Sequence, residues 1–253
     1  MRVLLAASQC DKGDVAGNLG KHLRILGEAA AGGCELAVFP EMSLTGSVDP
    51  AVHPEHLIGL DDPAVTALAT ATGTATGASD LAVCFGVAES TPDGPCITQV
   101  VAAAGGVLGV QRKRHLGEGE ESFVPATASE VFELAGVRFA VAICAESGFD
   151  GPFDAAASDG ARLVLFPAAP GLYGRRTDDA SWQAGLSWWE SCGLEDARRQ
   201  ASRLGLWIAA AGQSGSTVDE DFPGLAALVD PSGRVVVRLP DWREATLTVE
   251  IPL

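Results

Sequence analysis

Residues 137–149 read VRFAVAICAESGF, an apolar segment followed at once by small and polar residues. The apolar segment predicts a β-strand that ends at Ile143, which places Cys144 at the sharp turn after it. A side chain at a turn of this kind is exposed, and the neighbouring backbone N–H groups are free to bind an oxyanion. Cys144 is therefore a candidate nucleophile, and a buried structural cysteine is the alternative interpretation.

Strand-like and helix-like segments alternate on both sides of this stretch. Apolar runs and turn residues predict further strands at 3–8, 36–39, 81–87, 97–104, 107–111, 131–134, 163–166, 206–211, 225–229, 235–239 and 246–251. Helices are predicted at 18–31, 63–72, 153–158 and 180–204, with Asn18 as the first N-cap and an interruption at Gly193. The run ATATGTATGAS, residues 69–79, predicts a low-complexity loop. Early βαβ units and later hairpins predict one α/β domain over residues 1–253.

The composition is that of a globular protein, and it excludes several partners. Of the 253 residues, 47% are hydrophobic and 20% are charged, and no apolar run is long enough to span a bilayer. The formal net charge of −16 would repel DNA and RNA. Neither nucleic acid nor a membrane is therefore an expected partner, and an anionic substrate would need a local basic patch.

The N-terminus and the cysteines favour a cytoplasmic protein. The opening segment MRVLLAASQC is followed at once by Asp11 and Lys12, so it predicts a first strand and not a signal peptide. The six cysteines are scattered, with no CxxC pair and no Cys/His cluster at zinc spacing. In a reducing compartment they are expected to be free thiols, and no metal site is predicted.

Two further segments place charged side chains directly after predicted strands. In VFPEMSLTG, residues 38–46, burial would raise the pKa of Glu41 and make it a usable general base. The alternative is that Glu41 caps the turn through the backbone of Ser43 or Thr45.

In VQRKRHLGEGEESFVPA, residues 110–126, Lys113 follows a strand, and a simple basic patch is the alternative. His115 is a further candidate base, although a structural histidine is the more usual finding. The nearby glutamates either form a solvated acidic loop or include a partner for the lysine: Glu118, Glu120 and Glu121.

Taken together, FPEMSLTG, RKRHL and ICAESGF, in this order and spacing, resemble the nitrilase superfamily of carbon–nitrogen hydrolases, in its amidase-like branch. The resemblance covers nearly the whole chain, since GARLVLFPAA (160–169), ARRQASRLGLWIAAAGQSG (197–215) and FPGLAALVDPSGRVV (222–236) are also similar. It implies a four-layer α-β-β-α sandwich that associates into a homodimer or higher homo-oligomer. It also implies hydrolysis of a small linear amide, with no metal or cofactor.

The resemblance implies a role for each matching residue. Glu41 matches the general base, Lys113 the lysine on the oxyanion side, and Cys144 the nucleophile that forms a thioester. Many members carry a second glutamate before an F-x-P-G turn, which here reads FVPA at 123–126. That alignment favours Glu121 as the fourth catalytic residue, with Glu120 as the second choice.

The pocket departs from the family pattern. Ala145 and Glu146 follow the nucleophile where Tyr-Asp or Trp-Glu is common, and Gly148 stands where many amidase-like members have an arginine. The pocket is therefore expected to be wider, or less suited to a carboxylate. Substrate contacts are expected from Ala145, Glu146 and an aromatic segment, GLYGRRTDDASWQAGLSWWESCG (171–193), through Tyr173 and Trp182. Helix packing or a dimer interface is the alternative for that segment.

Several other functions stay open from the sequence. Within the family these are hydrolysis of an N-carbamoyl compound, hydrolysis of a nitrile, and acyl transfer. Outside it, the chain could be a non-catalytic binding or scaffold protein that keeps the fold, or a hydrolase that pairs Cys144 with His115.

Overall fold

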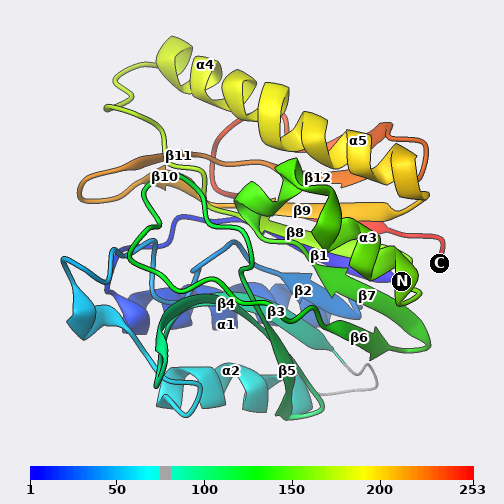
Figure 1. Cartoon of the computed structure of the whole chain (residues 1–253), viewed down its shortest axis with the longest axis horizontal. Helices are drawn as coiled ribbons and strands as arrows, with labels where there is room; N and C mark the ends of the chain where they lie inside the picture. Colours follow the sequence, from blue (N-terminus) through cyan, green and yellow to red (C-terminus); the bar gives the residue numbers. More distant parts are fainter. Residues whose placement is uncertain (75–80) are drawn as a thin grey trace.

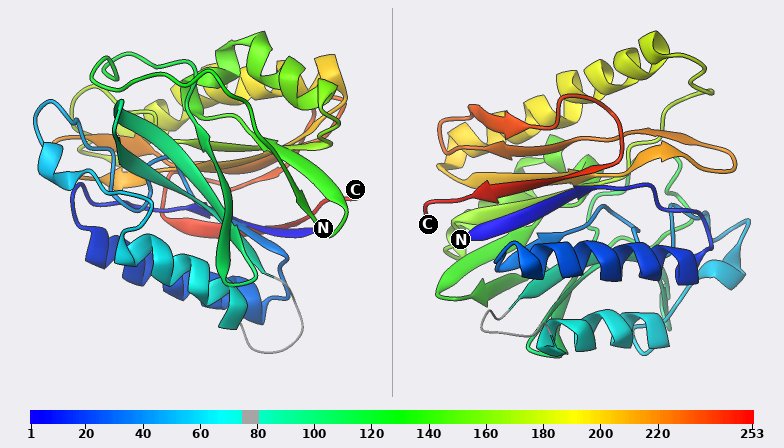
Figure 2. Two further views of the ribbon diagram at one scale, coloured as in Figure 1. Left: turned by 60° about the horizontal axis from the view of Figure 1, so that its bottom comes forward. Right: turned by 180° about the vertical axis from the view of Figure 1, so that it is seen from behind.

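Two six-stranded sheets lie face to face in the computed structural model, which describes residues 1–74 and 81–253 (Figure 1). Helices cover the outer face of each sheet, so the layers run helix, sheet, sheet, helix (Figure 2). The four-layer α-β-β-α sandwich implied by the resemblance is therefore confirmed.

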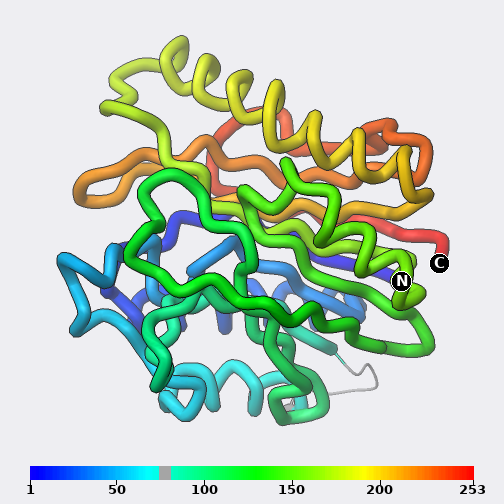
Figure 3. The backbone as a smooth tube through the Cα atoms, viewed as in Figure 1, coloured from blue at the N-terminus to red at the C-terminus, as the bar shows by residue number. Residues whose placement is uncertain are grey.

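The first sheet is built mainly from the N-terminal half of the chain. Its strand order is β14 (Ala245–Glu250), β1 (Arg2–Ala7), β2 (Leu36–Val38), β3 (Ala82–Thr91), β4 (Gly94–Ala103) and β5 (Gly106–Arg112). Its outer face is covered by α1 (Val15–Ala31) and α2 (Pro63–Thr74), and a short 3-10 helix, η1 (Pro54–His56), precedes α2. The pairing of β1 with β14 brings the two termini close together, and the Met1 ammonium donates to the Ile251 carbonyl at 2.9 Å (Figure 3).

The second sheet comes from the C-terminal half. Its order is β13 (Val235–Arg238), β12 (Ala226–Val229), β9 (Trp207–Gly212), β8 (Leu163–Ala168), β7 (Val137–Val141) and β6 (Val131–Leu134). Its outer face is covered by α3 (Asp150–Ser158), α4 (Asp179–Trp189) and α5 (Glu195–Leu204), with a π-helical turn η3 (Glu190–Leu194) between the last two. The remaining elements are η2 (Cys144–Gly148) and a hairpin of β10 (Ser214–Ser216) and β11 (Asp221–Pro223).

Strand side chains alternate between two apolar cores, as the two-residue period of a strand requires. In β1, Val3 and Leu5 enter the core between the two sheets, whereas Leu4 and Ala6 pack under α1 and α2. Both faces of the central strands are thus buried, which explains their nearly continuous apolar sequences. Each fully buried Leu or Val contributes roughly 1.5–3 kcal/mol through burial.

The carboxyl ends of the parallel strands determine where the site forms. β1, β2 and β3 are parallel in the first sheet, and β7, β8 and β9 are parallel in the second. The two sheets meet at this end, because Ser8, just after β1, pairs with Gln213, just after β9. Loops that follow β2, β7 and β8 therefore converge.

Some sequence predictions need correction. The N-cap of α1 is Asp14, whose carboxylate accepts from the Gly17 N–H, whereas Asn18 is buried and binds backbone groups of Asp11 and Leu44. α2 continues to Thr74, so the low-complexity run begins as helix, and its part at 75–79 lies outside the described residues. The β10–β11 hairpin was not predicted because its three-residue strands are too short to show a period. The interruption of the long helix near Gly193 is confirmed by η3.

Candidate active site

Glu41 lies in a buried turn after β2, and its carboxylate points into the molecule. Its side chain is 1% exposed, Oε1 accepts from Lys113 Nζ at 2.7 Å, and Oε2 accepts from the Ala169 N–H at 2.9 Å. The carboxylate therefore does not cap its own turn, which is the alternative that the sequence left open. Instead the turn is held by Ser43, whose hydroxyl contacts His22 Nε2 at 2.9 Å and accepts from the Gly86 N–H.

A close backbone approach fixes the same turn. A Cβ on Gly86 would lie 2.1 Å from the backbone nitrogen of Met42, so only glycine lets β3 pack directly against this loop. Met42 itself has φ +46°, in the left-handed region that residues with a side chain rarely adopt. The chain thus tolerates backbone strain next to Glu41, which is common where a side chain has to be held in place for function.

Lys113 follows β5 and is completely buried. Its ammonium donates to Glu41 Oε1 at 2.7 Å and to Glu120 Oε1 at 2.6 Å, so it lies between two carboxylates. Burial alone would lower the pKa of Lys113, but the charges of Glu41 and Glu120 raise it overall. The lysine therefore stays an ammonium, and the interpretation as a surface basic patch does not hold for this residue.

Glu120, and not Glu121, is the second carboxylate of the cluster. Its Oε1 accepts from Lys113 and its Oε2 from the Gly117 N–H at 2.5 Å, whereas Glu121 is exposed and accepts only from the Gly119 N–H at 3.1 Å. The structure therefore brings Glu120, the second choice from the sequence, to Lys113 and leaves Glu121, the first choice, outside the cluster. The loop turns after Glu120, as the Phe123 N–H donates to its carbonyl at 2.9 Å, and this turn directs Glu121 outward.

Cys144 lies at the turn between β7 and η2, as the sequence predicts. It has φ +46° and is 8% exposed, so a strained backbone presents the thiol at the floor of a cavity. Burial and the Glu41 charge raise the pKa of this thiol well above its usual value, and Lys113 opposes them. At neutral pH the resting side chain is a thiol with a carboxylate base beside it.

Glu41 itself is adapted to that role. Burial raises its pKa, and the Lys113 ammonium, which acts in the opposite direction, keeps the carboxylate form available. A carboxylate of raised pKa, next to a thiol and held by one ammonium, is a suitable proton acceptor.

Glu146 stabilises the turn between β7 and η2 that carries Cys144, and it does not line the cavity. It is fully buried, and its oxygens accept from the Arg114 N–H at 2.7 Å, the Arg114 guanidinium at 3.0 and 3.1 Å, and the Ile143 N–H at 2.8 Å. All of its acceptor positions are used by the protein. The structure thus places Glu146, predicted to bind substrate, outside the cavity lining, where its carboxylate fastens the ends of β5 and β7 together.

A cavity of about 310 Å³ opens above Cys144. Of the residues expected to contact substrate, Ala145 and Tyr173 line it. Trp182 does not, because it stacks on Trp242 with ring centroids 6.4 Å apart. The full lining is Gly117, Glu118, Glu120, Cys144, Ala145, Ser147, Gly148, Ala169, Pro170, Gly171, Tyr173, Trp188, Trp189, Cys192, Gly193 and Asp196.

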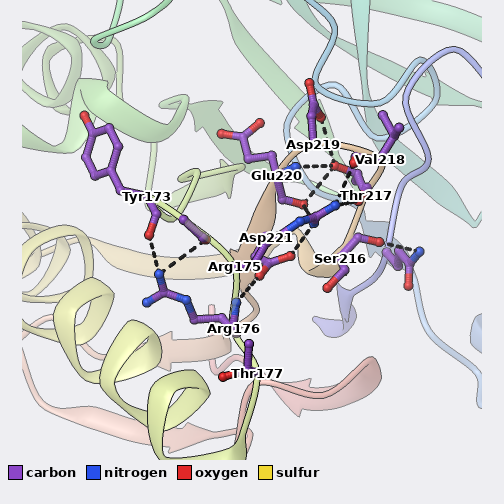
Figure 4. A network of polar contacts seen from close by, with 12 residues as sticks. Tyr173, Arg175, Arg176, Thr177, Ser216, Thr217, Val218, Asp219, Glu220 and Asp221 are labelled. Carbon is purple, nitrogen blue, oxygen red and sulfur yellow. Dashed lines mark hydrogen bonds and ion pairs between the residues drawn. The ribbon is translucent and has the colours of Figure 1, made fainter.

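A network of polar contacts fastens the segment that carries Tyr173 (Figure 4). Arg175 donates to the buried carboxylate of Asp221 at 2.7 Å and to the carbonyls of Thr217 and Val218 at 2.9 and 2.6 Å. The Arg176 N–H donates to the same carboxylate at 2.5 Å. Both arginines are thus engaged in holding this cavity wall against the β10–β11 hairpin.

Two other histidine-containing features lie away from the cavity. His115 stacks on Phe149 at 4.2 Å and is not among the cavity-lining residues, so it is badly placed as a partner for Cys144. In the described parts of the chain, one group of side chains is close enough to hold a metal ion: His53, Glu55 and His56. None of the three lines the cavity, and the two rings are stacked on each other.

Sequence reasoning missed four residues that contribute to the site. The backbone N–H of Ala169, after β8, binds Glu41, and nothing in residue type reveals a backbone donor. Asp196 lies on a helix that reads as an ordinary charged surface. Trp188 and Trp189 take the place expected for Trp182, and the aromatic run in 171–193 was the available signal.

Solved structures of one enzyme, the amidase from Nesterenkonia sp. AN1, share the fold. One, determined after thrombin removal of a His-tag, has a TM-score of 0.83 at 24% identity and covers 100% of this chain and 93% of that chain. A mutant with acrylamide added at the active-site cysteine gives 0.82 at 22% identity, with the same coverage. A mutant with the acetamide moiety of fluoroacetamide on that cysteine gives 0.83 at 23%, covering 100% and 90%.

A comparison with curated protein sequences gives no significant match. None of the helices in residues 1–74 and 81–253 is both long and apolar enough to cross a membrane. The carbon–nitrogen hydrolase family model matches residues 4–253, which is nearly the entire chain. The protein therefore belongs to the carbon–nitrogen hydrolase family, and it shares its fold with the Nesterenkonia amidase.

Proposed function

We propose that the protein hydrolyses a small linear amide through a thioester on Cys144. The observation that carries the proposal is the position of Lys113 Nζ, held between Glu41 at 2.7 Å and Glu120 at 2.6 Å, beside a strained cysteine at the floor of the cavity. A base, a fixed cation and a nucleophile in one desolvated cluster are the parts that acyl transfer requires.

In the first half-reaction Glu41 accepts the thiol proton as Cys144 Sγ attacks the amide carbon. The carbonyl oxygen becomes an oxyanion, stabilised by the Lys113 ammonium and by the N–H of Ala145, which lies in the first turn of η2 where N–H groups lack an intrahelical acceptor. The tetrahedral intermediate collapses and the carbon–nitrogen bond breaks. Glu41 returns its proton to the nitrogen, so that ammonia leaves and a thioester remains.

In the second half-reaction Glu41 accepts a proton from water, and the hydroxide attacks the thioester carbon. The carbon–sulfur bond breaks, the proton goes to the departing sulfur, and the carboxylic acid is released. Glu120 keeps the ammonium of Lys113 aimed at the carbonyl oxygen throughout, because it holds the side of Nζ that Glu41 does not.

The neighbours support this assignment. Mutants of the Nesterenkonia amidase carry covalent adducts of acrylamide and of the acetamide moiety of fluoroacetamide at the active-site cysteine. We assign the same nucleophilic role to Cys144, and we place nitriles and carbamoyl compounds after simple amides in the order of expected substrates.

The test is ammonia release from a panel of small amides, carbamoyl compounds and nitriles. Cys144→Ala is expected to abolish release, whereas Cys192→Ala is expected to change KM at most, because Cys192 lines the same cavity without contacting the charged cluster. No release from any compound, together with a Cys144 thiol that iodoacetamide does not alkylate, would favour a non-catalytic protein that keeps the fold.

A further inference from the structure

We infer that the cavity selects amides whose acyl part ends in an ammonium group, with Asp196 and Glu118 as the specificity-determining residues. The inference rests on the proposed amide hydrolysis and names its substrate class. It comes from the charges, the aromatic rings and the glycine at position 148 around the cavity above Cys144.

The charged side chains of the cavity wall are all acidic. Glu118, Glu120 and Asp196 line it, and among the described residues no Lys, Arg or His side chain does. Glu120 is paired with Lys113 below the floor. Lys113 also neutralises Glu41, so one ammonium serves two carboxylates and the cluster keeps a net negative charge. Glu118 and Asp196 add two negative charges nearer the opening.

Asp196 takes the side of the cavity that Gly148 leaves open. A Cβ built on Gly148 would lie 3.7 Å from Asp196 Oδ2, so a longer side chain at position 148 would cover this carboxylate. A substrate therefore meets the Asp196 carboxylate on this side of the cavity.

Neighbouring arginines do not neutralise the negative charges of Glu118 and Asp196. Arg199 approaches Asp196 Oδ1 only at 3.7 Å and pairs more closely with Asp150, at 2.8 Å. Arg175 is held by Asp221. Arg176 lines a separate hollow behind Tyr173 and Trp188, and donates to backbone carbonyls there.

Aromatic rings complete a site for a cation. Trp188, which is 46% exposed, and Tyr173, which is 79% exposed, both line the cavity, with Trp189 between the wall and the core. An ammonium over an indole or phenol face gains from the ring quadrupole, and this gain is larger where water is partly excluded. The Glu118 carboxylate beside the Tyr173 hydroxyl raises the pKa of that phenol, which places this negative charge at the same rim.

An amide whose acyl part ends in a carboxylate would be repelled by this cavity. It would enter a negative cavity without a cationic lining residue, and like charges in such an environment repel. The expected order of kcat/KM is therefore ammonium, then neutral, then carboxylate. Exposed charge pairs and cation–π contacts each contribute modestly, so the ammonium compound should exceed its methyl isostere by about tenfold.

The experiment compares three amide series matched in length, which end in an ammonium, a methyl and a carboxylate group, at neutral pH and low ionic strength. The measured quantity is the ratio of kcat/KM between the ammonium and methyl compounds. Asp196→Asn and Glu118→Gln are each expected to lower this ratio by about threefold, and added salt should lower it as well. Asp159→Asn and Glu133→Gln, exposed acids outside the cavity lining, are the matched controls and should leave the ratio unchanged.

Two results would overturn the inference. One is a wild-type enzyme that hydrolyses the methyl or carboxylate series at least as well as the ammonium series. The other is an ammonium preference that neither Asp196→Asn nor Glu118→Gln reduces. Absence of ammonia release from all three series is a different result, because it would refute the proposed amide hydrolysis itself.

Discussion

Glu120→Gln and Glu121→Gln form a matched pair that tests the geometry around Lys113. The two glutamates are adjacent in sequence, and the same substitution removes one charge from each. Glu120 belongs to a buried cluster, because its carboxylate accepts a hydrogen bond from Lys113 Nζ at 2.6 Å. The Glu121 side chain is exposed and contacts only a backbone N–H. The structure therefore predicts very different outcomes for two neighbouring variants.

The expected magnitude follows from the contact that is lost. Glu120→Gln replaces a charge-assisted hydrogen bond to the lysine, and such a bond is worth about 1.5–3 kcal/mol. If this energy is used to orient Lys113 toward the oxyanion, kcat falls by about 10- to 150-fold, since each 1.36 kcal/mol changes a rate tenfold. Glu121→Gln removes an exposed contact and should change kcat by less than about twofold.

The assay is steady-state ammonia release, accompanied by the pH dependence of iodoacetamide alkylation at Cys144. The Glu120 charge raises the pKa of the Cys144 thiol, so its removal should lower that pKa and move alkylation to lower pH. Glu121→Gln should leave the profile in place. A damaging Glu121→Gln with a silent Glu120→Gln would refute the reasoning.

Three other perturbations have defined outcomes. Glu146→Ala leaves the buried Arg114 guanidinium unpaired, so denaturant unfolding should show a loss of about 3–5 kcal/mol. Asp221→Asn weakens the contact with Arg175 that holds the cavity wall, and steady-state kinetics should show a higher KM with a smaller change in kcat. Burial lowers the pKa of His22 from 6.5 to about 4, so folding excludes its proton and stability should fall as the pH drops from 6.5 to 4, by about 3 kcal/mol. Unfolding curves across this range should show a smaller pH dependence in His22→Gln, and an unchanged one would contradict the assignment.

The fold was largely predictable because its strands and helices have clear apolar periods. The segment 137–149 already places a strand before Cys144, and β7 with η2 follows that pattern, although the strand ends at Val141. The elements that escaped prediction are short. The β10–β11 hairpin has three residues in each strand, and it is stabilised by contacts with distant residues such as Arg175. Such contacts leave no local period in the sequence.

The site was predictable to the level of residue type, but not always to the level of the individual side chain. Glu41 and Cys144 follow β2 and β7, which belong to parallel pairs, and Lys113 follows β5, which two antiparallel pairings turn to the same direction as β3. The choice between Glu120 and Glu121 depended on the direction of one turn, which a motif with a substituted last residue at Ala126 could not fix. The direction of the turn comes from backbone hydrogen bonds around Phe123.

Residues that act through tertiary contacts were misassigned for the same reason. Glu146 follows the nucleophile directly and so seemed suited to contact substrate, yet its charge is used by Arg114 from a distant loop. Trp182 belongs to the correct helix but faces Trp242, and Trp188 faces the cavity instead. The positions of Glu146 and Trp182 both depend on which face of a helix or turn packs against the rest of the protein.

The central claim is that Cys144 carries the acyl group during turnover. The most direct test is rapid quenching of the enzyme with a small amide, followed by mass spectrometry of the intact protein and of its cysteine-containing peptides. The account predicts a transient adduct equal to the amide minus ammonia, on the Cys144 peptide alone, and no adduct in Cys144→Ala. Ammonia release that persists in Cys144→Ala, or an adduct on Cys192 in its place, would contradict it.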